Sequence, residues 1–251
     1  MQSARPAVRG LQAPEIMRFL PGLKVSVVLA VFFASGISFL LPRVIDSRVK
    51  ASAAYVWDLP LETGDRSDWK SSVTRDKGAF LADRAAYEHM AAHLHTGVDL
   101  QSGRTPKPAE PVYAAAKGKV YDVKIQGAGT RVTIAHLLPT GEIVYSSYIH
   151  IADVRVKRGM RVDVSTLIGR TFNRQELKKY GAYYDHLHFQ LHRRAFVPSD
   201  TISLKTAGEV TERFYDPAVF FENYPKEGDL NWLKWLEKRQ VPFRQFLWLI
   251  F

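Results

Sequence analysis

The chain has 251 residues, enough for one sizeable domain with appendages, and its 46% hydrophobic and 24% charged residues are ordinary for a globular protein. Disorder is therefore not the expected state, and the absence of cysteine excludes disulfides and thiolate chemistry. A net charge of +10 would suit nucleic-acid binding, but no basic stripe, aromatic platform or helix-turn-helix signal supports that class, so we expect no nucleic-acid partner.

An uncharged apolar run at 25–41 is the first feature along the chain, and residues 1–50 around it carry seven Lys or Arg against two acidic residues. A run of about 17 residues is at the lower limit for a membrane-spanning helix and longer than the core of most signal peptides. We expect a transmembrane anchor here after a cytoplasmic basic N-terminus at 1–24, with a cleaved signal as the alternative. Residues 42–75 are polar and irregular and are expected to form a linker.

The segment at 83–92 is typical of a helix or loop, and His95, Gly97 and Asp99 follow it. Fully extended, the chain would hold His95 and Asp99 roughly 13 Å apart, near the limit for two side chains that share one ion. Gly97 permits the bend that brings them together.

Short β runs then follow, separated by turn signals about every ten residues. We expect strands at 111–116, 119–125, 131–137, 143–151, 154–162 and 186–192. This spacing predicts a mainly β fold with a small antiparallel sheet or barrel. The domain is expected to occupy residues 76–225.

Two more histidine motifs lie on these strands: Tyr148 with His150, and His186 with His188. Residues two apart in a strand share a face, so both members of each pair are expected on one face. A catalytic zinc site needs three protein ligands and one open position, and without cysteine it must be built from histidine and carboxylate. An isolated H-x-H is more often a polar strand face, but three motifs together favour zinc.

The remaining histidines are less persuasive. We expect a solvated surface position for His93, with a role beside the site or in substrate binding as its alternative, and exposed positions for His136 and His192. His89 shares the segment of His93 and is also left outside the site.

The motifs H-x-x-x-D, Y-x-H and H-L-H, in this order, resemble those of the LytM/lysostaphin-type zinc metallopeptidases, which cut peptide bonds in bacterial peptidoglycan. The similarity runs over 95–194 and includes 111–120, which is similar to a strand pair of that family. The resemblance implies a barrel-sandwich catalytic domain. It also implies that His95, Asp99 and His188 bind Zn²⁺, that His150 and His186 form the catalytic pair, and that Tyr148 could share in stabilising the oxyanion.

This resemblance predicts a zinc endopeptidase that cleaves the stem-peptide cross-links of peptidoglycan, with metal-activated water attacking the scissile carbonyl. Either His150 or His186 would take the proton. The enzyme would belong to the bacterial cell envelope, held in the inner membrane with its catalytic domain in the periplasm, or secreted after signal cleavage.

Two rival functions use similar residues. The first is a catalytically silent member of the same fold that binds or activates another cell-wall hydrolase; such a protein would be expected to lose zinc ligands. The second is a phosphohistidine carrier on a similar small barrel, which Asp99 as a third ligand argues against.

Two segments fall outside the family pattern. Relatives usually carry a short glycine-rich turn before H-L-H, whereas residues 170–185 are longer, bulkier and more aromatic and are expected to influence substrate choice. The tail at 226–251 has an amphipathic helical part and an apolar end. We expect it to pack against the domain, with docking to a partner protein or membrane surface as the alternative.

Overall fold

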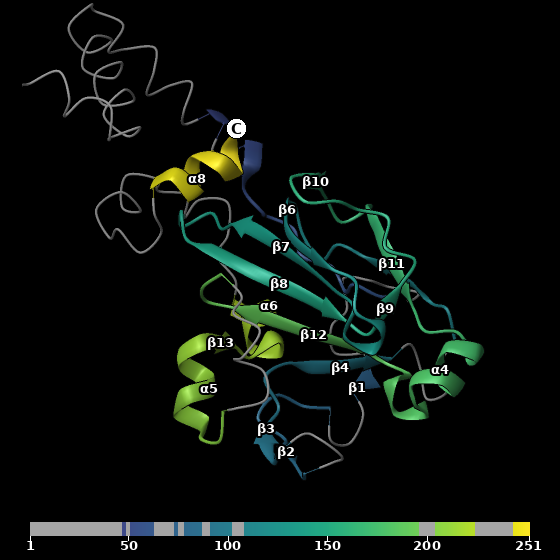
Figure 1. Cartoon of the computed structure of the whole chain (residues 1–251). Helices are drawn as coiled ribbons and strands as arrows, with labels where there is room; N and C mark the ends of the chain where they lie inside the picture. Colours follow the sequence, from purple (N-terminus) through teal and green to yellow (C-terminus); the bar gives the residue numbers. More distant parts are fainter. Residues whose placement is uncertain are drawn as a thin grey trace, which may run out of the picture. The chain divides into compact units, whose positions relative to one another are not determined.

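The structure is a computed structural model, and it describes residues 47–48, 51–62, 73–74, 78–86, 91–101, 108–195, 204–223 and 243–251 (Figure 1). Contacts separate Met1–Ser47 from Arg48–Phe251, and the strands described below all lie in the second unit. The predicted membrane span at 25–41 lies outside the described residues. Within the ranges described, no helix is both long enough and apolar enough to cross a bilayer.

One large antiparallel sheet brings the predicted motifs together. Its strands are β1 (Val73–Thr74), β4 (Val98–Gln101), β6 (Gly118–Lys124), β7 (Arg131–Leu137), β8 (Ile143–Ile149), β10 (Arg161–Val162), β12 (Leu187–His192) and β13 (Phe214–Tyr215). They lie in the order β1-β4-β12-β8-β7-β6-β10, and β13 pairs with β12. Strand β12 therefore lies between β4 and β8, although both are distant from it in sequence (Figure 1).

Two smaller sheets complete the β structure. One contains β5 (Pro111–Tyr113), β11 (Leu167–Thr171) and β9 (Ile151–Ala152) in that order. The other is a hairpin of β2 (Asp83–Arg84) with β3 (His93–Leu94). The prediction of a mainly β, antiparallel domain is confirmed.

The two faces of the large sheet differ because side chains alternate along each strand. Val132, Ile134 and Phe189 face a core that also receives Val112 and Ile168 from the smaller sheet. The opposite face carries a group of buried polar side chains beside apolar ones such as Leu137 and Ile143.

On that opposite face, Thr133 is the register partner of Ser147, and Ser147 is the register partner of Gln190. All three are fully buried, and the Thr133 and Ser147 hydroxyls are 3.0 Å apart. By the same alternation, this is the face that carries His188.

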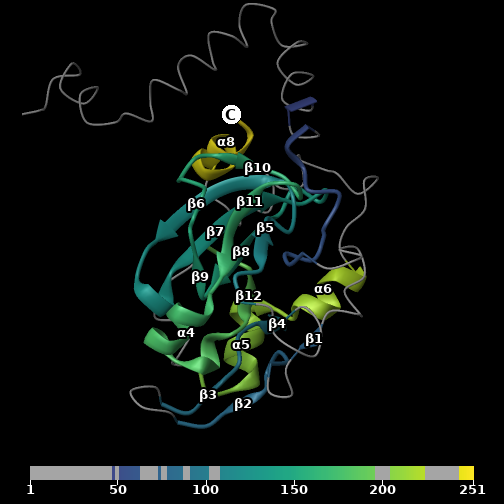
Figure 2. The same ribbon diagram turned by 90° about the vertical axis from the view of Figure 1, so that its right-hand side faces the viewer.

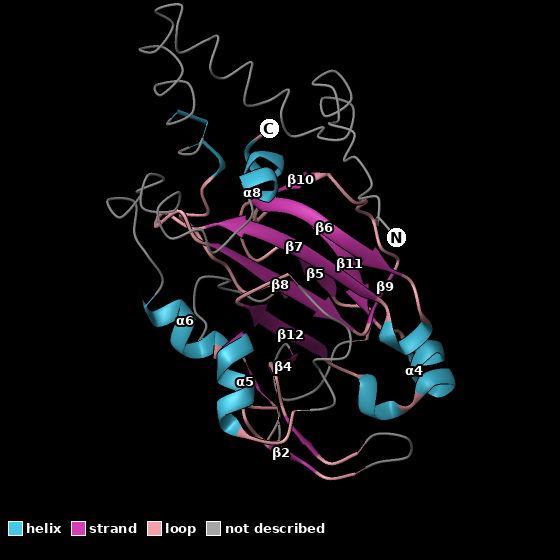
Figure 3. Ribbon diagram, turned by 60° about the vertical axis from the view of Figure 1, so that its left-hand side comes forward, coloured by secondary structure: helices cyan, strands magenta, loops and turns pink. Residues whose placement is uncertain are grey.

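The described helices are α4 (Arg174–Tyr180), α5 (Ala207–Arg213), α6 (Pro217–Asn223) and α8 (Phe243–Ile250), with 3₁₀ turns η2 (Gly127–Gly129) and η3 (Ala182–Tyr184). Helix α4 begins with a capping box, in which the Asn173 side chain accepts from the Glu176 amide and the Glu176 side chain accepts from the Asn173 amide. It lies beside β9 in each view (Figures 1, 2 and 3). The segment at 170–185 thus contains a capped helix where relatives are expected to have a turn.

Part of the expected linker belongs to the domain. Trp57, Leu59 and Leu61 are buried in the main core, and Leu61 forms an isolated bridge with Val112. The prediction of a linker over 42–75 is therefore wrong for this part, because every second side chain is apolar and fills the space beside β5.

The strand predictions were accurate where the alternation was clear. Strand β7 has the expected bounds, 131–137, and β8 ends two residues before the expected limit of 151. The prediction of a strand over 154–162 is wrong except for its last two residues, because Gly159, at φ +85°, makes a turn. Strands β11 and β4 were missed; β4 has only four residues, and all four are buried although apolar and polar residues alternate along it.

The end of the tail packs on the domain, as the first of the two alternatives predicted. Leu249 and Ile250 of α8 are buried. Lys119 and Arg161 donate to the carbonyls of Trp248 and Ile250 at 2.6 and 3.1 Å. Two cationic side chains therefore supply hydrogen bonds to carbonyl oxygens in the last turn of this helix.

Candidate metal centre

The first two predicted ligands are held by a short segment of backbone, residues 78–82. The amides of His95 and Asp99 donate to the carbonyls of Ala82 and Gly78, both at 2.9 Å, and the Leu81 amide donates to the His95 carbonyl. These backbone hydrogen bonds hold both ligand residues in place without the help of a metal ion.

Gly97 is required by a close approach to β12. A Cβ at this position would lie 2.3 Å from the carbonyl oxygen of Phe189, so any other residue would separate β4 from β12. The glycine thus brings the first ligand segment against the strand that carries His188.

The third predicted ligand lies opposite the second. His188 and Asp99 are register partners across the antiparallel pair β12 and β4. Directly opposed residues project from the same face of a sheet, so their side chains meet. Leu187, one residue earlier, is fully buried in the core on the other face.

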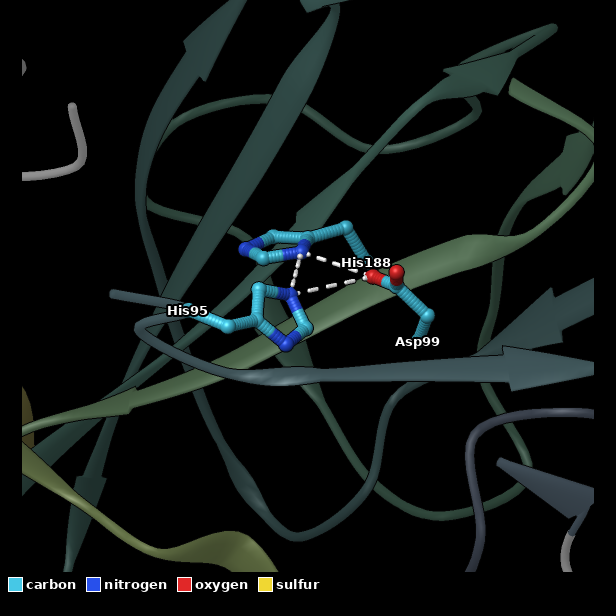
Figure 4. A group of neighbouring side chains, drawn as sticks. All are labelled: His95, Asp99 and His188. Carbon is cyan, nitrogen blue, oxygen red and sulfur yellow. Dashed lines mark hydrogen bonds and ion pairs between the residues drawn. The ribbon is translucent and has the colours of Figure 1, made fainter. Parts of the chain in front are cut away.

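The ligand atoms of His95, Asp99 and His188 form a compact triangle (Figure 4). His188 Nδ1 is 2.9 Å from both His95 Nε2 and Asp99 Oδ1, and the remaining side is 3.2 Å. Ligands of a tetrahedral zinc at about 2.0–2.2 Å lie about 3.4 Å from one another. Two imidazoles and one carboxylate at this spacing fit the ligand set of a catalytic zinc.

The charge of the site is fixed by Asp99. Burial opposes ionisation of this carboxyl, but hydrogen bonds with His186, His188 and His95 outweigh burial and hold its pKa well below the usual range. Burial lowers the pKa of His188 to about 4. An ionised carboxylate beside a neutral imidazole is the state that a metal ion requires of its ligands.

His95 also has a partner that orients its ring. Its Nδ1 lies 2.8 Å from the carbonyl oxygen of Ala79, which can only accept, so Nδ1 carries the proton and Nε2 presents its lone pair to the triangle.

The two expected catalytic histidines lie beside the triangle. His186 Nε2 is 3.2 Å from Asp99 Oδ1, and the ring centroids of His150 and His186 are 5.1 Å apart. His150 Nδ1 donates to the carbonyl of Ala128 at 2.6 Å, which leaves Nε2 as a proton acceptor. Burial, with repulsion from His186 and His188, lowers the pKa of His150 to about 3 and keeps it neutral.

The predicted orientation of Tyr148 is wrong. This tyrosine was expected to share the face of His150, but its ring is fully buried in the core and its hydroxyl accepts from the Ala115 amide at 2.7 Å. The alternation between the two residues is broken because His150 has a left-handed backbone, at φ +65°. Tyr148 therefore does not face the site with His150.

The predicted surface positions of His136 and His192 are also wrong, because the two residues are only 0% and 3% exposed. Nε2 of His136 lies 2.7 Å from the Ser146 hydroxyl, and its Nδ1 donates to the Lys117 carbonyl. His93 is half-buried and its Nδ1 bonds the Ala91 carbonyl of its own segment. His89 lies outside the described residues.

Two further side chains lie at the site: Arg84, which was not predicted, and Tyr184, from the segment that was expected to influence substrate choice. Arg84 Nη2 donates to Asp99 Oδ2 at 2.5 Å, and the Tyr184 ring lies 4.6 Å from that of His150. Arg84 precedes Asp99 by 15 residues in a two-residue strand, and no motif marks it. The sequence gives one indication of Tyr184, because this residue lies in an aromatic stretch just before His186.

Comparison with known proteins agrees with this geometry. Residues 93–200 match the family model described as peptidase family M23. The matched residues include all three predicted ligands and both further histidines, which confirms the resemblance to LytM/lysostaphin-type peptidases. A search of curated proteins found no match.

Several solved structures are similar at low identity. The antimicrobial peptidase lysostaphin from Staphylococcus simulans is 18% identical, with a TM-score of 0.42, over 68% of this chain and 55% of that chain. A complex of SpoIIIAH and SpoIIQ gives 18% identity and a TM-score of 0.42 over 65% and 99%. A zinc-containing peptidase from Vibrio cholerae gives 22% and 0.38 over 58% of this chain and 41% of that chain.

Proposed function

We propose that this protein is a zinc-dependent endopeptidase that cleaves peptide cross-links of bacterial peptidoglycan. The observation that carries the proposal is the triangle of His95, Asp99 and His188, with two further histidines beside it, in a domain of a peptidase family. A silent member of the fold would not be expected to keep the complete set.

Zinc bound by these three residues would supply Lewis-acid activation of water and of the scissile carbonyl. The other steps belong to the chain's own groups. The bond from Nδ1 of His150 to the Ala128 carbonyl leaves Nε2 as the acceptor position, so His150 is placed to take the proton of the attacking water. His186, held near Asp99, would then stabilise the charge that develops on the carbonyl oxygen.

The substrate proposal follows the family resemblance. Stem peptides of peptidoglycan lie outside the cytoplasm, so the proposal includes a place in the cell envelope, with residues 25–41 as an inner-membrane anchor and the domain in the periplasm. Secretion after cleavage of that segment is the alternative. The protein's partners would be the peptidoglycan and the membrane.

The test is digestion of purified peptidoglycan by the zinc-loaded full-length chain, with new amino groups as the readout. We expect release of amino groups that stops on chelation and returns with zinc, and no release by His188→Ala. Bound zinc without any release of amino groups would contradict the endopeptidase and favour the silent, binding or activating member of the fold.

A further inference from the structure

Arg84 is a polar side chain at the metal centre that the proposed reaction does not use. Its Nη2 donates to Oδ2 of Asp99 at 2.5 Å. The Arg84 side chain is 27% exposed, whereas that of Asp99 is 2% exposed, so the ion pair lies at the edge of the buried site. Its Nε has no acceptor among the described residues, which leaves the Asp99 carboxylate as the acceptor that fixes the guanidinium.

The two oxygens of Asp99 therefore have separate surroundings. Oδ1 faces the nitrogens of His95, His186 and His188 at 2.9–3.2 Å. Oδ2 faces Arg84. A charge-assisted hydrogen bond to one carboxylate oxygen makes that oxygen a weaker ligand and favours binding of a metal ion through the other.

The backbone explains why Arg84 reaches this position. Arg84 pairs with His93 in the β2–β3 hairpin, two residues before His95. The preceding residues, 78–82, are those that bond the backbones of His95 and Asp99 and the ring of His95. Arg84 thus extends one continuous segment that holds two ligands at their main chains and side chains.

We propose that Arg84 is a positioning residue for the metal centre, which holds Asp99 as a ligand through one oxygen. This inference rests on the proposed function, because it assumes that the triangle binds zinc. Binding through both oxygens would raise the coordination number and occupy space that the open position of a catalytic zinc requires. Arg84 would therefore keep that position open without touching substrate.

The test uses the full-length chain with Arg84→Ala, Arg84→Lys and, as a control, Arg193→Ala. Arg193 is also an arginine at a strand end, but it bonds the Thr211 carbonyl and covers the Tyr215 ring, away from the triangle. Zinc affinity is measured by competition with a chromogenic chelator. The cobalt-substituted protein gives a visible spectrum whose intensity falls as the coordination number rises.

For Arg84→Ala we expect zinc to bind about 10–100-fold more weakly, as is typical when a partner of a ligand is removed, and cobalt absorption to weaken. Arg84→Lys keeps the positive charge but not the planar guanidinium, so its zinc affinity and cobalt absorption should lie between those of the wild type and Arg84→Ala. Arg193→Ala should match the wild type.

Wild-type affinity and an unchanged cobalt spectrum in Arg84→Ala would overturn the inference; if that variant does not fold, the same result in Arg84→Lys overturns it. A purely structural ion pair would lower thermal stability but leave the cobalt spectrum unchanged. A wild type that holds no zinc would contradict the proposed function as well. If the wild type binds zinc and cleaves peptidoglycan, and Arg84→Ala has the same zinc affinity and cobalt spectrum, only the role of Arg84 is contradicted.

Discussion

His150 owes its position to one backbone angle. Its φ of +65° turns the chain at the end of β8, and the ring then points to His186 and His188 instead of the core. Positive φ costs energy for a residue with a Cβ, and such strain is found most often at functional sites. The proposed role of His150 as proton acceptor depends on this turn.

Replacing His150 with Ala should abolish most cleavage while zinc stays bound, because His150 is not part of the ligand triangle. Loss of a general base lowers rates by about 10²–10⁴-fold. The measurement is zinc content together with release of amino groups from peptidoglycan. His93→Ala is the control, since its ring bonds its own segment and both quantities should be unchanged. Loss of zinc from His150→Ala would show that a ligand has been mistaken for a catalyst.

His136 should make stability depend on pH. Burial lowers its pKa from 6.5 to about 4, so the folded protein keeps it neutral while the unfolded chain takes up a proton below about pH 6.5. The contribution of neutral, buried His136 to the free energy of unfolding is therefore complete above pH 6.5. It is lost as the pH falls from 6.5 to about 4. A shift of this size corresponds to about 3 kcal/mol of the free energy of unfolding.

Denaturant unfolding between pH 4 and 7 tests this prediction by comparing the wild type with His136→Gln. The variant should be less stable at pH 7 but should lose less stability on acidification. Parallel pH profiles for the two proteins would contradict the prediction and assign the acid sensitivity to other buried groups such as His192, whose pKa is also lowered, to about 3.

Most residues of the site could be predicted from the sequence. His95, Asp99, His150, His186 and His188 come together as the three motifs and their order indicated, although the pairing of β4 with β12 that joins them could not be read from local patterns. Tyr148 could not be placed, since a positive φ at a histidine leaves no mark in the sequence. Arg84 was missed because its contact depends on the fold of a hairpin rather than on spacing.

Among the elements, the segment at 170–185 lies beside the histidines of the site. It ends β11, forms the capped helix α4, and places the Tyr184 ring against His150, where the Tyr183 ring is 4.2 Å from that of Tyr184. We propose that its aromatic and cationic groups contact stem peptides, whose carboxylates pair well with cations, and favour directly cross-linked over glycine-bridged walls.

Replacing residues 173–184 with a short glycine-rich turn tests this proposal and leaves β11 intact. The graft should retain zinc, because no ligand is changed, and should alter which muropeptides are released, as measured by chromatography of the digest. Gln175→Ala, an exposed change on α4, is the control and should release the wild-type set. The same bonds cut at the same relative rates by graft and wild type would end the specificity proposal but not the peptidase proposal.

The elements themselves were predictable to different degrees. Strands with clear alternation, such as β7, were located correctly, because one face meets the core. Strand β4 and the buried residues near Trp57 were not, since each is a short alternating run that adjoins the ligand motif or a polar segment instead of a series of regular strands. The capping box of α4 is visible as Asn173 and Glu176 in the sequence, but the short helix lacks an apolar face to reveal it.

At the scale of the whole molecule, the proposed location depends on residues 25–41. If they form an anchor, this segment remains in the mature protein and residues after it lie outside the cytoplasm. N-terminal sequencing of membrane-extracted protein measures this directly. A mature start near residue 51 would mean a cleaved signal, and a protein found entirely in the cytoplasm would contradict both.

The central claim is that His95, Asp99 and His188 together bind a catalytic zinc. The most direct measurement is an anomalous-scattering map of the crystallised, zinc-loaded protein at the zinc absorption edge. We expect one peak about 2.0–2.2 Å from His95 Nε2, Asp99 Oδ1 and His188 Nδ1, with His150 and His186 near it but not bound to it. A peak bound by His186 or His150 in place of one of the three, or no peak at the triangle, would contradict the account.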